Sequence, residues 1–218
     1  MNKTLLSTAI VSVLALTSAS ALAHKAGDML VRVGLTNVAP DASSSDVILG
    51  GANTGLRLDV DSNTQLGLNF AYFLTDNWNI EVLAATPFKH DIEIVGVGPL
   101  GETTHLPPTV TANYFFLDDS SAFQPYAGIG LNYTIFFDEG FTDASEAGGF
   151  ADLDLDASFG LSAQLGFDYM LNDEWFINAS ASYIDISTDA TFTAGGAPGS
   201  VTVDIDPYVY TLSVGYKF

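Results

Sequence analysis

Residues 206–218, which read "DPYVYTLSVGYKF", decide the fold class of this chain. The even positions from Tyr208 onward are all apolar, with aromatic residues at both ends and Leu212 and Val214 between them. The odd positions are mainly small or polar. Because a strand points successive side chains to opposite faces, this segment has one continuous apolar face. Such a face with aromatic ends is typical of a strand in a membrane barrel.

Further segments upstream show the same period-two alternation, which is the main sequence signal for a strand. In each of them the apolar face is nearly free of charge over about ten residues, a pattern that fits lipid better than the solvated exterior of a lipocalin-like barrel. The eight segments lie near 28–38, 64–74, 78–86, 108–117, 124–137, 157–171, 175–187 and 201–218.

The connections between these segments alternate in length. Tight polar turns at 75–77, 118–122 and 172–174 alternate with long connections around 39–63, 87–107, 138–156 and 188–200. Short turns at one end, long loops at the other and an even strand number are typical of bacterial outer-membrane barrels. The sequence therefore predicts an all-β fold, an eight-stranded antiparallel transmembrane up-and-down barrel with both termini in the periplasm.

The N-terminal segment indicates the cellular compartment of the protein. Residues 1–23 begin with Lys3, continue through an apolar stretch and end on Ala21-Leu22-Ala23. A basic start, a short apolar run and a small-residue cleavage site are the parts of a secretory signal peptide, and the run is too short for a membrane-spanning helix. We therefore expect a signal peptide over 1–23 and a barrel domain over 24–218, located in the outer membrane.

Composition limits the partners. The chain has no cysteine, so disulfides cannot stabilise it outside the cytoplasm. It carries 26 acidic and 6 basic residues, a formal net charge of −20, which excludes nucleic acid as an expected partner. The expected partners are outer-membrane lipid, lipopolysaccharide and the barrel assembly machinery, because a terminal Phe218 after alternating apolar residues resembles the C-terminal signal of outer-membrane proteins.

Aromatic residues at the strand ends are expected to form two interfacial girdles, since amphipathic rings prefer the headgroup level. Trp78 and Trp175, the only two tryptophans, each follow a tight turn. They would join the inner girdle, although ordinary core tryptophans are the alternative. The expected girdle residues are Trp78, Trp175, Tyr216 and Phe218 at the inner interface and Tyr208 and Tyr210 at the outer one.

Several stretches resemble the outer-membrane protein W family of small bacterial barrels. They include "HKAGDMLVRVG", "NTQLGLNFAYFLTDNW", "EVLAATPFKHDI", "HLPPT", "FQPYAGIGLNYTIFFDEGF" and the closing segment, and they follow the family's order over nearly all of residues 24–218. The resemblance implies a barrel with a narrow, largely apolar lumen that passes small hydrophobic solutes across the outer membrane. The alternative is a structural or receptor barrel whose acidic extracellular loops bind surface partners. No motif places a catalytic serine, histidine and acid together, so no enzyme is expected.

The inward-facing set follows from the same parity. Arg32 and Glu81 are the charges expected at membrane depth, where a pair would brace the lower lumen, with selection of a substrate as the alternative. Apolar plugs are expected at mid height above them, giving a pocket open above and closed below. The resemblance implies that Leu83 constricts the lumen. The expected lumen residues are Leu30, Leu83, Phe115, Phe176, Ser182 and Ile184.

Four prolines, Pro87, Pro107, Pro108 and Pro207, lie at or just beyond the outer ends of predicted strands. Proline lacks the N–H that a strand ladder needs, so pairing is weakened at each position. Two interpretations stay open. The prolines either end the strands at the membrane rim or mark a lateral gap through which an apolar solute leaves the lumen.

Histidines and acids in the predicted loops are the remaining candidates. His90 and His105 flank the tip of one hairpin and could face each other, but two ligands make a weak metal site, so we expect exposed polar residues and neither a metal nor a cofactor. The segment "DLDLD" would place Asp152, Asp154 and Asp156 on one strand face within a solvated acidic loop, with divalent cations as bridging candidates.

Overall fold

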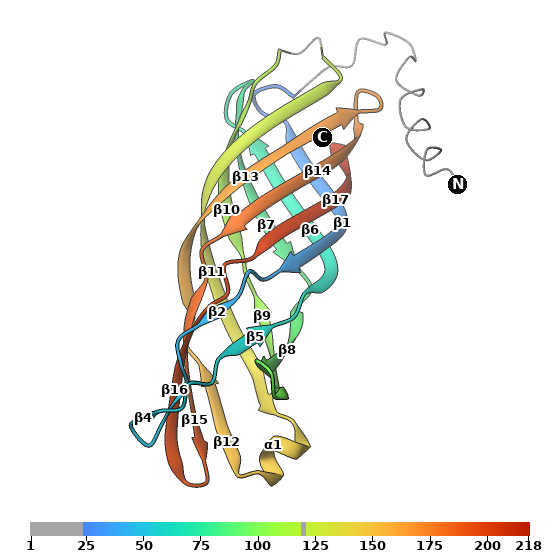
Figure 1. Ribbon diagram of the computed structural model, residues 1–218. Coiled ribbons are helices and arrows are strands. Elements are labelled where there is room, and N and C mark those ends of the chain that lie inside the picture. The colour runs from blue at the N-terminus through green and yellow to red at the C-terminus, as the bar shows by residue number, and fades with distance from the viewer. Residues whose placement is uncertain (1–23, 119–120) are drawn as a thin grey trace, which may run out of the picture.

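Eight long strands form a closed barrel in the computed structural model, which describes residues 24–118 and 121–218 (Figure 1). Each strand pairs antiparallel with its neighbours, in the order β10-β7-β6-β1-β17-β14-β13-β11, and pairing of β10 with β11 closes the ring. The predicted fold class is confirmed, whereas the predicted signal peptide lies outside the described residues. The barrel strands are β1 (Met29–Ala39), β6 (Asn63–Phe73), β7 (Trp78–Ala85), β10 (Thr109–Phe115), β11 (Phe123–Phe141), β13 (Ser158–Met170), β14 (Trp175–Ile184) and β17 (Tyr208–Lys217).

Side chains alternate between the outside and the inside of the barrel wall along every one of these strands. On β13, Leu165 is 67% exposed whereas Ser162 is 5% exposed. The two ends of the chain meet where β1 pairs with β17, with Val33 opposite Val214 on the outer face. This outward band of aliphatic side chains is the surface that the alternation predicts for lipid contact.

Aromatic side chains gather at both ends of the outer surface. At the periplasmic end, the Trp78 ring lies 5.1 Å from that of Tyr114, and the Trp175 ring lies 4.9 Å from that of Tyr216. Phe218 lies 4.7 Å from Tyr216. At the other end, Tyr208 and Tyr210 are about half exposed. The expected girdle residues thus lie on the outer surface, four of them at the periplasmic end of the barrel and Tyr208 and Tyr210 at the opposite end of β17.

The long connections are strands and not irregular loops. The predicted eighth strand is wrong at its start, because residues 201–204 belong to a separate strand that ends before Pro207. Among the described residues, no helix has the length and the apolar character needed to cross a membrane. The extracellular elements are β2 (Ser43–Ser44), β3 (Ile48–Leu49), β4 (Ala52–Asn53), β5 (Leu58–Val60), β8 (Phe88–Ile94), β9 (Gly98–Leu106), α1 (Asp143–Ala147), β12 (Phe150–Leu155), β15 (Ser187–Ala194) and β16 (Ala197–Asp204).

These elements form two small sheets beyond the outer end of the barrel, visible in the lower part of Figure 1. One sheet runs β5-β8-β9 and continues into the outer half of β11, and the other runs β12-β15-β16-β3-β4. Their inner faces share one hydrophobic core, to which Phe88, Ile92, Phe192 and Val203 contribute. A second, smaller cluster of buried apolar residues lies at the periplasmic end of the barrel.

Candidate functional site

A network of buried charges crosses the lower part of the lumen. The guanidinium of Arg32 donates to the carboxylate of Glu81, and its Nη2 lies 2.8 Å from Oδ2 of Asp168. All three side chains are at most 2% exposed. Asn69 donates to Glu81 and Asn178 to Asp168. Buried ions persist only when they are paired and hydrogen-bonded in this way, so the network is a layer of paired charges in the lumen.

Asp168 is the member of this network that the sequence prediction missed. It lies on the inward parity of β13, in the same register as Gln164 and Gly166, so the alternation was the signal that could have identified it. The predicted proximity of Arg32 and Glu81 is present in the structure. Asp168 also lies within hydrogen-bond distance of His24.

His24 and a group of aromatic rings form the floor of the barrel. Nε2 of His24 lies 2.9 Å from Oδ2 of Asp168, and the imidazole is stacked on Phe73 at a centroid distance of 4.7 Å. Phe115 and Phe176 meet the same ring edge-on at 5.3 and 5.5 Å. Gly215 is required at this level, because a Cβ there would lie 2.1 Å from the Phe176 ring.

The order of apolar and charged side chains along the barrel axis differs from the prediction. Leu30, Phe115 and Phe176 are buried, but they belong to the periplasmic cluster and lie below the charges, not above them. The expectation of apolar plugs at mid height is therefore wrong for these three residues. The reason is topological, since Leu30 precedes Arg32 on a strand that starts in the periplasm, and Phe115 and Phe176 lie beside periplasmic turns.

Mid height is occupied by small polar side chains that hydrogen-bond to one another. The hydroxyls of Thr36 and Thr211 lie 3.1 Å apart, and Ser182 donates to Gln164 at 2.9 Å. Leu83 is half-buried on the inner face at this level, paired with Thr109 on β10. Its role as a constriction stays a prediction. A lumen closed in this manner by side chains agrees with the narrow interior of an eight-stranded barrel.

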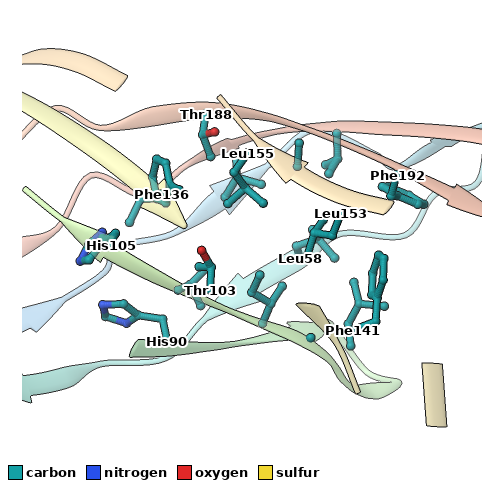
Figure 2. Close-up of a pocket in the computed structure, with 18 residues that line it drawn as sticks. Leu58, His90, Thr103, His105, Phe136, Phe141, Leu153, Leu155, Thr188 and Phe192 are labelled. Carbon is teal, nitrogen blue, oxygen red and sulfur yellow. The ribbon is translucent and has the colours of Figure 1, made fainter. Parts of the chain in front are cut away.

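An apolar vestibule lies between the two extracellular sheets (Figure 2). It is a narrow cavity of about 40 Å³. Several of its residues come from segments predicted as long connections, among them Leu58, Ile92 and Phe141. Ile184, one of the expected lumen residues, is 1% exposed and belongs to the same core. The apolar lining includes Leu58, Ile92, Phe136, Phe141, Leu153, Leu155, Phe192, Val201 and Val203.

His90 and His105 lie at one end of this vestibule, together with Thr103 (Figure 2). The two histidines are 2% and 1% exposed, and their ring centroids are 4.8 Å apart. The expectation of exposed polar residues is therefore wrong. Both positions alternate with outward-facing residues in the β8–β9 hairpin, which turns them toward the core.

Burial determines the protonation of these two side chains. It lowers the pKa of His90, against weaker opposing effects of the Asp61 carbonyl and carboxylate. It lowers the pKa of His105 to about 3, with a smaller contribution from His90. Both imidazoles are thus neutral at pH 7. In the part of the chain that the structure describes, no group of three or more His, Cys, Asp or Glu side chains is arranged to hold a metal ion.

The hydrogen-bond ladder of the barrel wall is interrupted beside these histidines. Pairing between β7 and β10 stops at Leu83 and Thr109, and it resumes between β8 and β9 at Phe88 and His105. Pro87, Pro107 and Pro108 lie within this interruption.

Pro207 is in a different environment from these three prolines. Both ladders of β17 continue to its neighbour Tyr208, and its carbonyl accepts from the backbone N–H of Ile184 at 3.2 Å. It therefore lies in a continuous wall. The sequence alone grouped the four prolines together because all of them end strands.

The acidic segment predicted to form one carboxylate face is a bulged strand. Its register shifts between Ala151 and Asp154, and Asp152 has a positive φ of 56°. Asp152, Asp154 and Asp156 are exposed, whereas Leu153 and Leu155 between them line the vestibule. The segment therefore contributes apolar side chains to the cavity and carboxylates to the surface.

Comparisons with known proteins agree with this architecture. The profile of the OmpW family matches residues 25–218. Outer membrane protein W of Vibrio cholerae is 49% identical over 223 residues, covering 100% of both chains. The crystal structure of the outer membrane protein OprG from Pseudomonas aeruginosa superposes with a TM-score of 0.87 at 46% identity, covering 90% of this chain and 98% of OprG.

A more distant relative is the dibenzothiophene metabolism operon protein PahQ of Pseudomonas aeruginosa, which is 28% identical over 190 residues, covering 86% of this chain and 87% of PahQ. The family profile spans almost all of the described barrel, and the relatives above 40% identity cover nearly the whole chain. The chain belongs to the OmpW family of outer-membrane β-barrel proteins.

Proposed function

We propose that this protein takes up small hydrophobic molecules passively across the outer membrane. A solute would enter the vestibule between the extracellular sheets and leave through the wall interruption at Pro87, Pro107 and Pro108 into the outer leaflet. The observation that carries the proposal is an apolar cavity above a lumen closed by buried ion pairs.

The closed lumen is what favours a sideways exit. A solute moving straight down would have to separate Arg32 from its two carboxylates and displace the aromatic floor around His24. Breaking a buried pair costs about 3–5 kcal/mol, and an apolar solute offers no hydrogen bond in return. Above the charges, a solute that left through the interrupted ladder next to His105 would pass from the apolar core to lipid without crossing this layer.

The name of one relative supports the solute class. PahQ is named for an operon of dibenzothiophene metabolism, and dibenzothiophene is an apolar aromatic compound. The apolar lining of the vestibule suits solutes of that class, because burying apolar surface contributes about 25 cal/mol per Å².

The experiment is uptake of dibenzothiophene by cells that carry the protein, its double variant Pro87→Val/Pro107→Val, or no copy. Valine restores the missing N–H groups and favours strand pairing, so the double variant should close the interruption and reduce uptake toward the level without the protein. Pro207→Val is the matched control, since Pro207 lies in a continuous wall, and it should leave uptake unchanged.

Two outcomes would count against the proposal. Equal uptake with and without the protein would favour the alternative of a receptor barrel, whose exposed acidic hairpins bind partners. Normal uptake by the Pro87→Val/Pro107→Val variant, at wild-type surface abundance, would show that solutes do not leave through this interruption.

A further inference from the structure

Three buried polar atoms at the inner end of the vestibule have no partner. Among the residues that the structure describes, nothing hydrogen-bonds to Nε2 of His90, Nε2 of His105 or Oγ1 of Thr103. Leaving a buried polar group unpaired costs about 1–3 kcal/mol, so each such group in a native protein requires an explanation. All three side chains line one cavity and lie together at one end of it in Figure 2.

The hydrogen bond at Nδ1 determines the tautomer of His90. Nδ1 lies 2.6 Å from the backbone carbonyl oxygen of Asp61, which can only accept a hydrogen bond. Nδ1 therefore carries the proton, and Nε2 is left as a free acceptor. The hydroxyl of Thr103 can both donate and accept. The site thus offers an acceptor and a hydroxyl side by side at the end of an apolar chamber.

The free acceptor on His90 and the hydroxyl of Thr103 favour a ligand group that carries no charge. A carboxylate would need a cation, yet both imidazoles are neutral and the charged groups that act on His90, Asp61 and Asp91, are negative. A hydroxyl is the simplest uncharged group that can donate to Nε2 of His90 and also exchange a hydrogen bond with Thr103. Hydrocarbons, by contrast, would leave all three atoms unpaired.

We propose that His90, Thr103 and His105 recognise a hydroxyl group, and that the preferred solutes are uncharged amphiphiles with one hydroxyl on an apolar body, such as alkylphenols. This inference rests on the proposed function and names the class of solute. The site adjoins the exit, because His105 pairs with Phe88 directly after Pro87. The hydroxyl would be held beside the interruption while the apolar body packs between the two extracellular sheets, which would have to move apart because the cavity is only about 40 Å³.

The test compares uptake of 4-hexylphenol with that of hexylbenzene, which has the same shape without the hydroxyl. Cells with the wild-type protein should show protein-dependent uptake of both and favour the phenol. Thr103→Val and His90→Phe should each lower the phenol-to-benzene uptake ratio roughly three- to tenfold, the loss expected from one hydrogen bond. Thr104→Val, one residue along β9 and on its other face, is the matched control and should keep the wild-type ratio.

A direct readout uses the full chain in lipid nanodiscs with ¹⁵N-labelled histidine. Adding 4-hexylphenol should shift the Nε2 resonance of His90, and hexylbenzene should not. An equal ratio in wild type, Thr103→Val and His90→Phe, with uptake intact, would overturn the hydroxyl site and leave the proposed function standing. Absence of protein-dependent uptake for both compounds would overturn the proposed function itself. Binding of Zn²⁺ alone at micromolar concentration, lost in His90→Phe, would assign the site to a metal instead.

Discussion

Arg32 is the residue whose loss we expect to destabilise the barrel most. Arg32→Met would leave Glu81 and Asp168 buried together without their shared cation, at a cost of about 3–5 kcal/mol in the free energy of unfolding. Urea titration of the protein folded in lipid vesicles measures this quantity. Lys89→Met is the control, because the pair of Lys89 with Glu102 is exposed and should matter little. Equal effects of the two changes would mean that water hydrates the lower lumen.

His105 makes the extracellular sheets sensitive to acid. Its pKa is about 3 in the folded protein, against an ordinary value of 6.5, so the unfolded chain binds a proton first as the pH falls. The stability of this part is therefore fully present above pH 6.5 and declines between pH 6.5 and about 3, by roughly 1 kcal/mol per pH unit. His90, whose pKa is lowered as well, adds in the same direction.

We expect His105→Phe to flatten this dependence. Amide hydrogen exchange of β8 and β9 in nanodiscs at pH 7 and pH 5 reports local opening of the hairpin. The wild-type hairpin should exchange faster at pH 5 after correction for the intrinsic rate, and the variant should show a smaller difference. A wild-type hairpin with equal protection at both values would contradict the assignment of a buried neutral His105.

At the scale of elements, alternation located the barrel strands but not their extent beyond the membrane. The segment of β8 alternates as well, since Phe88, His90, Ile92 and Ile94 are separated by charged residues. The sequence predicts a long connection here because the segment follows Pro87, whose missing N–H weakens strand pairing. The strands of a barrel can continue beyond the membrane as sheets in water. Period-two alternation identifies an apolar face, but it does not show whether lipid or a protein core covers that face.

Pairings between distant segments could not be predicted from the sequence. Strand β16 pairs with β2 and β3, which lie about 150 residues earlier in the chain. The two residues of each short strand carry no periodicity, so only the folded core fixes their register. The same holds for His24, whose contact with Asp168 spans 144 positions and leaves no local sequence signal.

The outward face of β13 can be compared with an exposed extracellular turn by a pair of arginine substitutions. Leu165 is 67% exposed on the barrel wall, and Val97 is 72% exposed in the β8–β9 turn. Leu165→Arg should lower stability by about 2–4 kcal/mol if that face meets the middle of the bilayer, whereas Val97→Arg faces water and should assemble normally. The heat-modifiable shift in electrophoretic mobility measures the assembled fraction. Normal assembly of both variants would place Leu165 outside the hydrocarbon layer.

At the scale of the whole molecule, the protein has two regions, an extracellular vestibule and a periplasmic seal, that are formed by different residues. The vestibule lies within the extracellular sheets, and the charged and aromatic seal lies at the periplasmic end, with hydrogen-bonded polar residues between them. Solute traffic and ion leakage should therefore respond to different substitutions. In a protein that conducted solutes straight through its lumen, the same substitutions would change both solute uptake and ion conductance.

The variants His24→Ala and Ala190→Trp test these two regions independently. The first removes the ring on which Phe73, Phe115 and Phe176 converge, so single-channel conductance to small ions in planar bilayers should rise while hydrophobic uptake stays unchanged. The second fills the vestibule, because Ala190 is 4% exposed and lines the cavity, so uptake should fall without a change in conductance. If His24→Ala instead raised uptake and conductance together, solutes would have to pass the floor of the barrel, and a sideways route above the charges would be wrong.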